Sequence, residues 1–475
     1  MIEQLAGGLE MKVYNSLTRK KEEFITQVPG EARIYVCGPT VYNFFHLGNA
    51  RPFVVFDTLR RYLEYLGNDV KFVQNFTDVD DKIIKRAKEE NLTAMEVADK
   101  YIAEYYKDAK ALNVRPATVH PRVSENIPQI IEFVQTLIDK GYAYEVEGDV
   151  YYSTRKFEGY GKLSKQNIEE LEAGARIMVE EKKKDPMDFA LWKARKEESE
   201  IAWESPWGMG RPGWHIECSA MSKRYLGPTL DLHAGGQDLQ FPHHENEIAQ
   251  SEACNGCTYA RYWMHNGYIT IDKEKMSKSL GNFFTVREIL EKYKGEVIRF
   301  FLLSGHYRSP IDYNDNLMEM AKASLGRMEN AKKNLEFLIE NSQGEMTAEE
   351  KEIFAGFDQY KAEFEKAMDD DLNTADAISA IFELVTAINT AVKDGASKEL
   401  AEKSLAFLLN LANVLGLLEA EDTNEIDDEI QKLVEERQQA RKDKNFARAD
   451  EIRDILKAQG ITLKDTPQGV QIVRD

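Results

Sequence analysis

Two short strings in the sequence carry residue types suited to binding a nucleotide. In the first, residues 46–49 (His-Leu-Gly-Asn), His46 and Asn49 are spaced to share one face at the start of a helix. A helix N-terminus offers free N–H groups and the positive end of the helix dipole, which suit a phosphate. The second string, residues 275–279 (Lys-Met-Ser-Lys-Ser), lies about 230 residues later and holds Lys275 and Lys278. Taken separately, the strings are also typical of a turn and of a solvated loop.

A second set of side chains has the donor atoms of a metal site. His243 and Glu247 stand at i and i+4, so a helix would place both on one face. With the thiolates of Cys37 and Cys218 they make four plausible zinc ligands. The four are scattered over about 210 residues. Their spacing alone therefore also allows Cys37 and Cys218 to be small buried side chains with no ligand role.

The remaining two cysteines form the pattern Cys254-x-x-Cys257. Such a pair can be a redox couple or half of a zinc site. Here no second pair and no flanking histidine accompanies it, and a helix with better ligands directly precedes it. We therefore expect these two cysteines to be bystanders.

The hydrophobic pattern around these residues indicates a parallel α/β sheet. A short apolar strand over residues 32–37 leads to a helical pattern over 46–65 and a second strand over 70–76, which together predict a βαβ unit. Two further strand-like runs, at 229–233 and 261–265, each end in a glycine-containing loop. In open α/β sheets ligands bind outside the carboxyl ends of the strands. We expect the chemistry to lie in these loops.

The chain is too long for one core, and its composition changes along its length. Residues 141–203 are more polar and predict an insertion between two halves of a catalytic domain, 11–140 and 204–316. From residue 317 strand signals vanish and apolar residues recur at helical spacing, which predicts a helical bundle over 317–420. Seven carboxylates between Glu419 and Glu429 predict a solvated linker, and a basic stretch within residues 430–475 follows.

Composition narrows the class of protein. The 475 residues carry a net charge of −20, which argues against nucleic-acid binding over the whole surface but allows a local basic face. Only four cysteines are present, which fits a reducing cytoplasm. No apolar run reaches 18 residues, so no membrane partner is expected, and no secretory signal is visible. Residues 1–10 read as an extension before a native-like start at Met11.

The two nucleotide-binding strings belong to a series of longer motifs that occur in a fixed order along the chain. A given five-residue string occurs by chance in on the order of one chain in 10⁴. In this chain CGPTVYNFFHLGNAR, NFTDVDDKII, DFALWK, GWHIECSAM, HAGGQDLQFPHHENEIAQSEA, MHNG and KMSKSLGN occur in that order. Together they closely resemble the cysteinyl-tRNA synthetases, a family of class I aminoacyl-tRNA synthetases. The resemblance extends from Met11 to the C-terminus, where residues 447–472 resemble the end that reads the anticodon.

The resemblance implies a role for each candidate residue. It implies that one Zn²⁺ per chain is held by Cys37, Cys218, His243 and Glu247, with His244 as a near neighbour. The cysteine pocket would be formed by Gly38, Thr77 and Trp214, although a tryptophan is also often a core residue. The implied ATP contacts are His46, Asn49, His233, Gly235, Gly236, Asp238 and Lys278, with Lys275 assisting at the pyrophosphate and Mg²⁺ expected.

The implied fold is a doubly wound Rossmann-type catalytic domain with an insertion, followed by a helical bundle and a small anticodon-binding end. The implied activity joins L-cysteine, ATP and tRNA(Cys) through cysteinyl-adenylate. We expect a cytoplasmic monomer. Two alternatives stay open. One is a cysteine ligase acting on an amino sugar, which should lack the basic C-terminal end. The other is a zinc- or cysteine-sensing protein with a decayed active site, against which both intact nucleotide-binding strings argue.

Overall fold

The computed structural model describes residues 11–166, 182–198, 200–271, 273–276, 283–419, 425–443, 445–458, 461–466 and 469–474. By its contacts the chain divides into two compact units. The first comprises Met1–Met318 and Ala367–Ala375, and the second Glu319–Lys366 and Asp376–Asp475.

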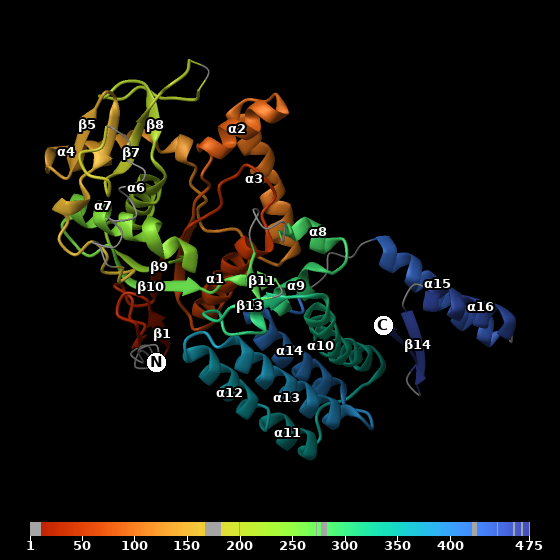
Figure 1. The fold of residues 1–475 in the computed structure, drawn as a ribbon. Coiled ribbons are helices and arrows are strands. Elements are labelled where there is room, and N and C mark those ends of the chain that lie inside the picture. The colour runs from red at the N-terminus through yellow and green to blue at the C-terminus, as the bar shows by residue number, and fades with distance from the viewer. Residues whose placement is uncertain are drawn as a thin grey trace. The chain divides into compact units, whose positions relative to one another are not determined.

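A four-stranded parallel sheet forms the centre of the first unit, in the order β10-β9-β3-β4 (Figure 1). Its strands are β3 (Glu31–Val36), β4 (Asp69–Gln74), β9 (Leu230–Gly236) and β10 (Ala260–Asn266). The four predicted strands are thus present, and the predicted Rossmann-type sheet is confirmed. The order runs outward from β3 in both directions, so the point where the winding reverses lies between β3 and β9. Ligands of doubly wound sheets bind at the carboxyl edge beside this point.

Helix α1 (Leu47–Tyr65) connects β3 to β4 and packs against β4, β9 and β10. Its first turn has no acidic residue. The helix is capped instead by His46, whose Nδ1 accepts a hydrogen bond from the backbone N–H of Asn49 at 3.2 Å. The start of α1 therefore keeps its positive dipole end without a carboxylate to offset it.

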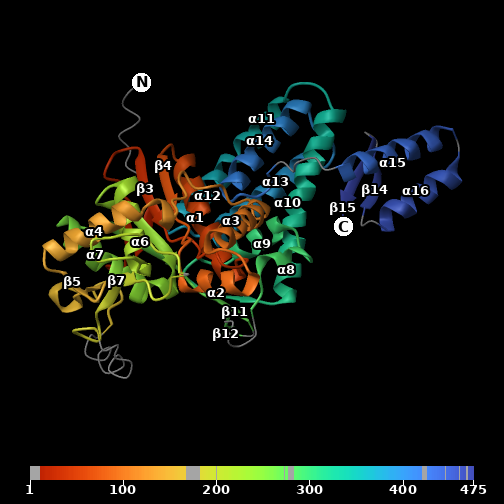
Figure 2. The same cartoon turned by 90° about the horizontal axis from the view of Figure 1, so that it is seen from above.

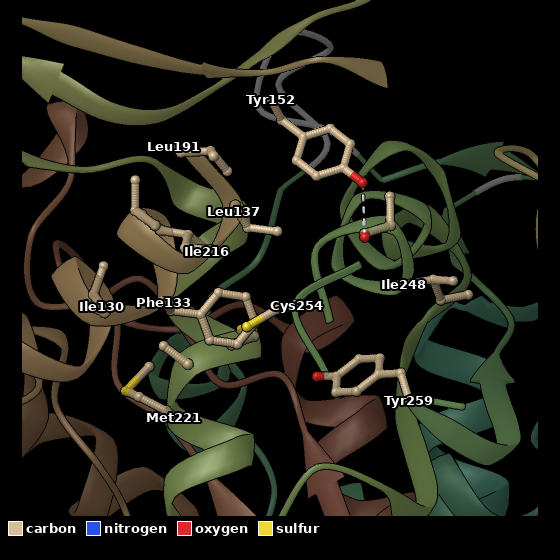
Figure 3. Close-up of a cluster of buried hydrophobic side chains, with 14 of the residues drawn as sticks. Ile130, Phe133, Leu137, Tyr152, Leu191, Ile216, Met221, Ile248, Cys254 and Tyr259 are labelled. Carbon is tan, nitrogen blue, oxygen red and sulfur yellow. Dashed lines mark hydrogen bonds between the residues drawn. The ribbon is translucent and has the colours of Figure 1, made fainter. Parts of the chain in front are cut away.

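Helices α4 (Ile127–Asp139), α6 (Trp214–Leu226) and α7 (Glu245–Asn255) lie side by side next to a small antiparallel sheet (Figures 1 and 2). That sheet has the order β5-β6-β7-β8 and falls within the predicted insertion and just after it. Its strands are β5 (Ala143–Val146), β6 (Asp149–Tyr152), β7 (Phe189–Ala194) and β8 (Gly210–Pro212). Figure 3 shows part of the large core between these elements, where Phe133, Leu137, Ile216, Ile248 and Cys254 are buried together.

Short elements complete the first unit. β11 pairs with β12 antiparallel and with β13 parallel, and β1 pairs with β2 antiparallel. The elements are β1 (Lys12–Asn15), β2 (Lys20–Glu23), α2 (Asp81–Glu90), α3 (Ala94–Ala111), β11 (Ile269–Ile271), β12 (Glu274–Lys275), α8 (Val286–Leu290), α9 (Gly295–Leu303) and β13 (Ile311–Tyr313).

The segment Ala367–Ala375 returns to the first unit, a feature that the predicted bundle of residues 317–420 does not include. Asp371 explains the return. Its carboxylate accepts hydrogen bonds from the Tyr307 hydroxyl, from Arg308 Nε and from the backbone N–H of Tyr14, each at 2.7 Å.

Most of the second unit is helical, as predicted. The apolar residues at helical spacing are buried, among them Ile378, Ile381 and Leu408. The helices are α10 (Asp315–Asn341), α11 (Ala348–Ala355), α12 (Asp358–Asp369), α13 (Thr374–Val392) and α14 (Lys398–Val414). α13 is long and apolar enough to cross a membrane, with a mean hydropathy of 1.4. Its buried residues recur every three to four positions, which is typical of a core helix.

The C-terminal part of the second unit consists of α15 (Glu425–Lys442), α16 (Phe446–Ala458) and an antiparallel hairpin of β14 (Ile461–Thr466) and β15 (Gly469–Arg474) (Figure 2). The prediction of a solvated linker over Glu419–Glu429 is wrong in its second half, because α15 begins at Glu425. The charge of this run therefore did not indicate where the chain becomes helical.

Candidate active site

A cavity of about 360 Å³ opens in the first unit, lined by the loops that follow β3, β4, β9 and β10 and by the start of α1. This is the edge where the sheet topology predicts a ligand. Ten of the predicted site residues line it together: Cys37, Gly38, His46, Asn49, Thr77, Trp214, Cys218, Gly236, Asp238 and His243. Glu247, which is fully buried, lies in hydrogen-bonding contact with two of these.

The four predicted metal ligands lie close together, and three of them, Cys37, Cys218 and His243, line the cavity. The Cys37 and Cys218 sulfurs are 3.9 Å apart, and Cys218 Sγ lies 3.6 Å from His243 Nε2. Glu247 Oε1 lies 3.6 Å from Cys37 Sγ and 3.1 Å from His243 Nε2. All four ligand atoms lie within 4.8 Å of one another, and all four residues are buried. Such a group can hold a metal ion.

The charges of this cluster depend on one another. Hydrogen bonding to Cys37, and then the neighbouring His243, lowers the pKa of Cys218 to about 6 despite its burial. Burial opposes the charged form of Glu247, but His233 and His243 hold its pKa well below the usual range. Burial raises the pKa of Cys37 well above the ordinary value. The cluster therefore favours a thiolate at Cys218 and a carboxylate at Glu247, both of them anionic metal ligands.

A layer of polar side chains lies behind the ligands. His243 Nδ1 is 2.9 Å from His215 Nδ1. His244 Nε2 lies 3.3 Å from Cys37 Sγ, and His244 Nδ1 lies 2.8 Å from His265 Nε2. His233 Nε2 lies 2.7 Å from Glu247 Oε2. Cys37, His233, His244 and Glu247 form a second group of four close ligand atoms, which shares two members with the first. His233 was predicted to contact ATP, yet among the described residues it belongs to this layer and not to the cavity lining.

The two nucleotide-binding strings meet at the N-terminus of α1. A Cβ on Gly48 would stand 3.1 Å from the Met276 side chain, so the glycine permits this close approach. On the other side of the second string, the Leu47 N–H donates to the Phe284 carbonyl at 3.1 Å, and the rings of His46 and Phe283 are 4.9 Å apart. Lys278 lies outside the described residues, and of Lys275 the structure describes only the backbone, in β12.

The predicted cysteine-binding residues line the same cavity as three of the metal ligands and the start of α1. Trp214 is 42% exposed and its ring lies 4.4 Å from that of His243, so it is not a core aromatic. Thr77 donates from Oγ1 to Glu217 Oε2 at 2.9 Å. The Gly38 N–H donates to Asn75 Oδ1 at 2.9 Å, and a Cβ on Gly38 would collide with the Asn75 backbone. Asn75 and Glu217 were not singled out from the sequence, because nothing in their spacing marks them.

Three other predicted positions lie apart from the cavity lining. A Cβ on Gly235 would stand 3.1 Å from the His244 ring, so the glycine serves packing against that ring. Cys254 is buried beside Phe133 in the hydrophobic core, and the Cys257 thiol lies 3.5 Å from Thr229 Oγ1. Both cysteines are free thiols, and among the described residues neither belongs to a group of close metal ligands.

Family comparisons agree with this site. Residues 23–323 match the class I (C) tRNA synthetase catalytic domain, residues 363–419 match the DALR domain, and residues 423–474 match the cysteinyl-tRNA ligase anticodon binding domain. The last match favours the tRNA ligase over the amino-sugar alternative, which should lack this end. The catalytic family uses ATP and Mg²⁺.

Solved structures show the same fold at low identity. Mycobacterium tuberculosis methionyl-tRNA synthetase, solved with methionyl-adenylate, is 15% identical with a TM-score of 0.56, over 81% of this chain and 89% of that one. The Agrobacterium radiobacter K84 agnB2 LeuRS, in a ternary complex with tRNA and LeuAMS, is 12% identical with a TM-score of 0.59, over 83% and 86%. The catalytic-domain match covers more than half of the chain, so the chain belongs to the class I aminoacyl-tRNA synthetases. Its match to the anticodon binding domain of cysteinyl-tRNA ligases makes it a cysteine–tRNA ligase of the cysteinyl-tRNA synthetase family.

Proposed function

We propose that this ligase selects cysteine with a single zinc ion held by Cys37, Cys218, His243 and Glu247. The observation that carries the proposal is the spacing of the four donor atoms. With Zn–S near 2.3 Å and Zn–N or Zn–O near 2.0–2.1 Å, a regular tetrahedron has edges of about 3.8 Å for S–S, about 3.5 Å for S–N or S–O and about 3.3 Å for N–O. The measured separations are 3.9, 3.6, 3.6 and 3.1 Å in the same order of atom pairs.

The donor set suits the discrimination that the reaction needs. Cysteine differs from serine only by sulfur for oxygen, and an apolar pocket separates such close analogues poorly. A bound zinc ion would favour a thiolate over a hydroxyl and lower the pKa of the substrate thiol. Gly38, Thr77 and Trp214 would hold the rest of the amino acid, since all three line the cavity beside the ligands.

The ATP site is proposed in the same cavity. His46 and Asn49 would present the start of α1 to the phosphates, and Gly236 and Asp238 line the cavity where the adenosine would lie. The proposed contacts also include His233 and Gly235, which would act from behind the lining, and Lys275. Lys278 would neutralise the charge that develops on the leaving pyrophosphate.

In the proposed reaction, the cysteine carboxylate displaces pyrophosphate from ATP and forms cysteinyl-adenylate. A ribose hydroxyl of the terminal adenosine of tRNA(Cys) then attacks the acyl carbon, which forms the ester and releases AMP. No side chain needs to act as a general base in the first step, because a carboxylate is already a nucleophile. The residues of the cavity then contribute by positioning and by electrostatic stabilisation. We also infer that the protein is a monomer in the reducing cytoplasm, a location that its four free thiols support. The inferred domains are two catalytic halves over 11–140 and 204–316, an insertion over 141–203, a helical bundle over 317–420 and an anticodon-reading end over 430–475.

The deciding experiment is cysteine-dependent ATP–pyrophosphate exchange, with and without a large excess of serine, on protein whose zinc content has been measured. We expect about one zinc per chain and no inhibition by serine. Stripping the metal with a chelator should abolish exchange, and added zinc should restore it. Full exchange by metal-free protein would overturn the zinc proposal and leave the family assignment untouched.

A further inference from the structure

The two oxygens of the Glu247 carboxylate have different contacts. Oε1 faces the other ligands, at 3.1 Å from His243 Nε2 and 3.6 Å from Cys37 Sγ. Oε2 points away from them and accepts two hydrogen bonds, from His233 Nε2 at 2.7 Å and from the Tyr259 hydroxyl at 2.9 Å. Both donors are buried, as Glu247 is, so water does not compete for this oxygen.

Tyr259, which directly precedes β10, is itself held in place by three contacts. Its backbone carbonyl accepts from the Leu230 N–H at 2.8 Å, its backbone N–H donates to Glu252 Oε1 at 3.3 Å, and its hydroxyl lies 2.9 Å from Ser222 Oγ on α6. A carboxylate can only accept, so the phenol hydrogen points to Glu247 and a hydrogen bond with Ser222 requires the serine to donate. Figure 3 shows Tyr259 within the core beside α7.

We propose that Tyr259 is a positioning residue that fixes Oε2 of Glu247, so that the carboxylate presents Oε1 alone to the metal. This inference rests on the proposed zinc site. A carboxylate with two available oxygens can bind a metal through both and so take the position that a substrate sulfur needs. Because Oε2 is hydrogen-bonded to Tyr259 and His233, it is kept from binding the metal. The coordination position for the substrate sulfur therefore stays open. Tyr259 then acts on cysteine binding through Glu247, without touching the substrate.

The chain offers a matched control in Tyr152. Its side chain is also fully buried in the same core, and its hydroxyl donates to the Ala249 carbonyl on α7 at 2.9 Å. Figure 3 shows both tyrosines in this core, with the hydrogen bond of Tyr152 as a dashed line. Tyr152→Phe therefore removes one buried phenol–α7 hydrogen bond, as Tyr259→Phe does, without changing the carboxylate.

The test measures zinc affinity by competition with a chromophoric chelator, and then the KM values for cysteine and ATP at saturating zinc. Removing an outer partner of a metal ligand typically costs about 10–100-fold in metal affinity or activity. We expect Tyr259→Phe to weaken zinc binding by about this factor and to raise KM for cysteine while KM for ATP stays unchanged. In cobalt-substituted protein, the visible bands should lose intensity as the metal gains a fifth ligand. Tyr152→Phe should change none of these quantities.

Two outcomes would overturn the inference. One is wild-type zinc affinity and wild-type KM for cysteine in Tyr259→Phe. The other is an equal loss in Tyr152→Phe, which would assign the effect to packing of α7. If Tyr259→Phe does not fold, Ser222→Ala takes its place. It keeps the tyrosine ring and removes the hydroxyl that contacts the phenol, together with the hydrogen bond of that hydroxyl to the Ser219 carbonyl in the same helix. A smaller shift in the same direction supports the inference, and no shift contradicts it. Wild-type protein without zinc would instead refute the proposed function.

Discussion

In the cluster of candidate metal ligands the ionisable groups are buried, whereas most of the described charged side chains of the C-terminal helices α15 and α16 lie on the surface, with Arg437 as an exception. Cys218, His243 and Glu247 are at most 2% exposed and share one cluster. In contrast, Arg448 pairs with Glu436 on side chains that are 37% and 49% exposed. Among the described residues, the hydrophobic cluster beneath the C-terminal helices is small, with Val434, Ile452, Leu456 and Ile461 as its buried members.

This difference predicts how each region responds to mutation. In the buried cluster each group sets the charge of its neighbours, so removing one should disrupt all of them. Exposed pairs are worth little individually, and binding of a polyanion is the sum of many small contributions. The active site should therefore fail at single residues, and the C-terminal region should fail only when it is lost as a whole.

The largest effect should come from Lys278→Ala. Removing one contact to charge that develops in a transition state typically costs about 3–4 kcal/mol. Adenylate formation should slow by on the order of 10²–10³, with cysteine affinity nearly unchanged. Pre-steady-state measurement of adenylate formation tests this. Lys273→Ala is the control, a nearby exposed lysine outside the string, and should leave the rate unchanged. A normal rate in Lys278→Ala would remove the residue from the mechanism.

The next effect should be loss of the metal in Cys218→Ser. Losing a ligand should exceed the roughly 10–100-fold cost of losing an outer partner, so most of the zinc should be absent after purification. KM for cysteine should rise far more than KM for ATP. The double variant Cys254→Ser/Cys257→Ser is the control and should keep its zinc. Should that variant lose the metal while Cys218→Ser keeps it, the ligand assignment is wrong.

Prediction from sequence succeeded where structure is set locally. The helical pattern of α1 and the i, i+4 spacing of His243 and Glu247 give the correct faces, and β3 and β4 follow from short apolar runs. The approach of Cys37 to Cys218 is different, because it depends on how β3 and α6 pack. Spacing alone allowed these cysteines to be either metal ligands or small core residues. The motifs around them favoured the metal ligands.

Packing also explains what the sequence did not predict. His233 follows the pattern of a nucleotide-binding loop, but it lies within β9 and its side chain faces Glu247. Tyr259 lies outside every quoted motif, and its contact with Glu247 joins residues from two elements. The acidic run before residue 430 was interpreted by charge alone, and charge does not distinguish a linker from the start of a helix such as α15.

A smaller effect, and the direct test of the surface region, is deletion of all residues after Gly416. Cysteine-dependent pyrophosphate exchange should persist, because the cavity belongs to the first unit. Charging of tRNA(Cys) should fall by about tenfold or more, since one unstacked base contact is worth about 1–3 kcal/mol. Undiminished charging by the truncated enzyme would show that the tail does not read the anticodon.

The smallest effect should come from Arg448→Ala, in the middle of the exposed charges. The guanidinium pairs with Glu436 at 2.9 Å and Glu451 at 2.8 Å, but all three side chains are exposed, so its loss should leave the free energy of unfolding nearly unchanged. If Arg448 contacts a phosphate, the slope of log affinity for tRNA against log salt should fall by about 0.7–0.9, and affinity should drop only a few-fold. Glu436→Gln is the matched control and should not reduce the slope. A loss of binding as complete as that of the deletion would mean that one surface residue governs recognition, and the contrast between the two regions would fail.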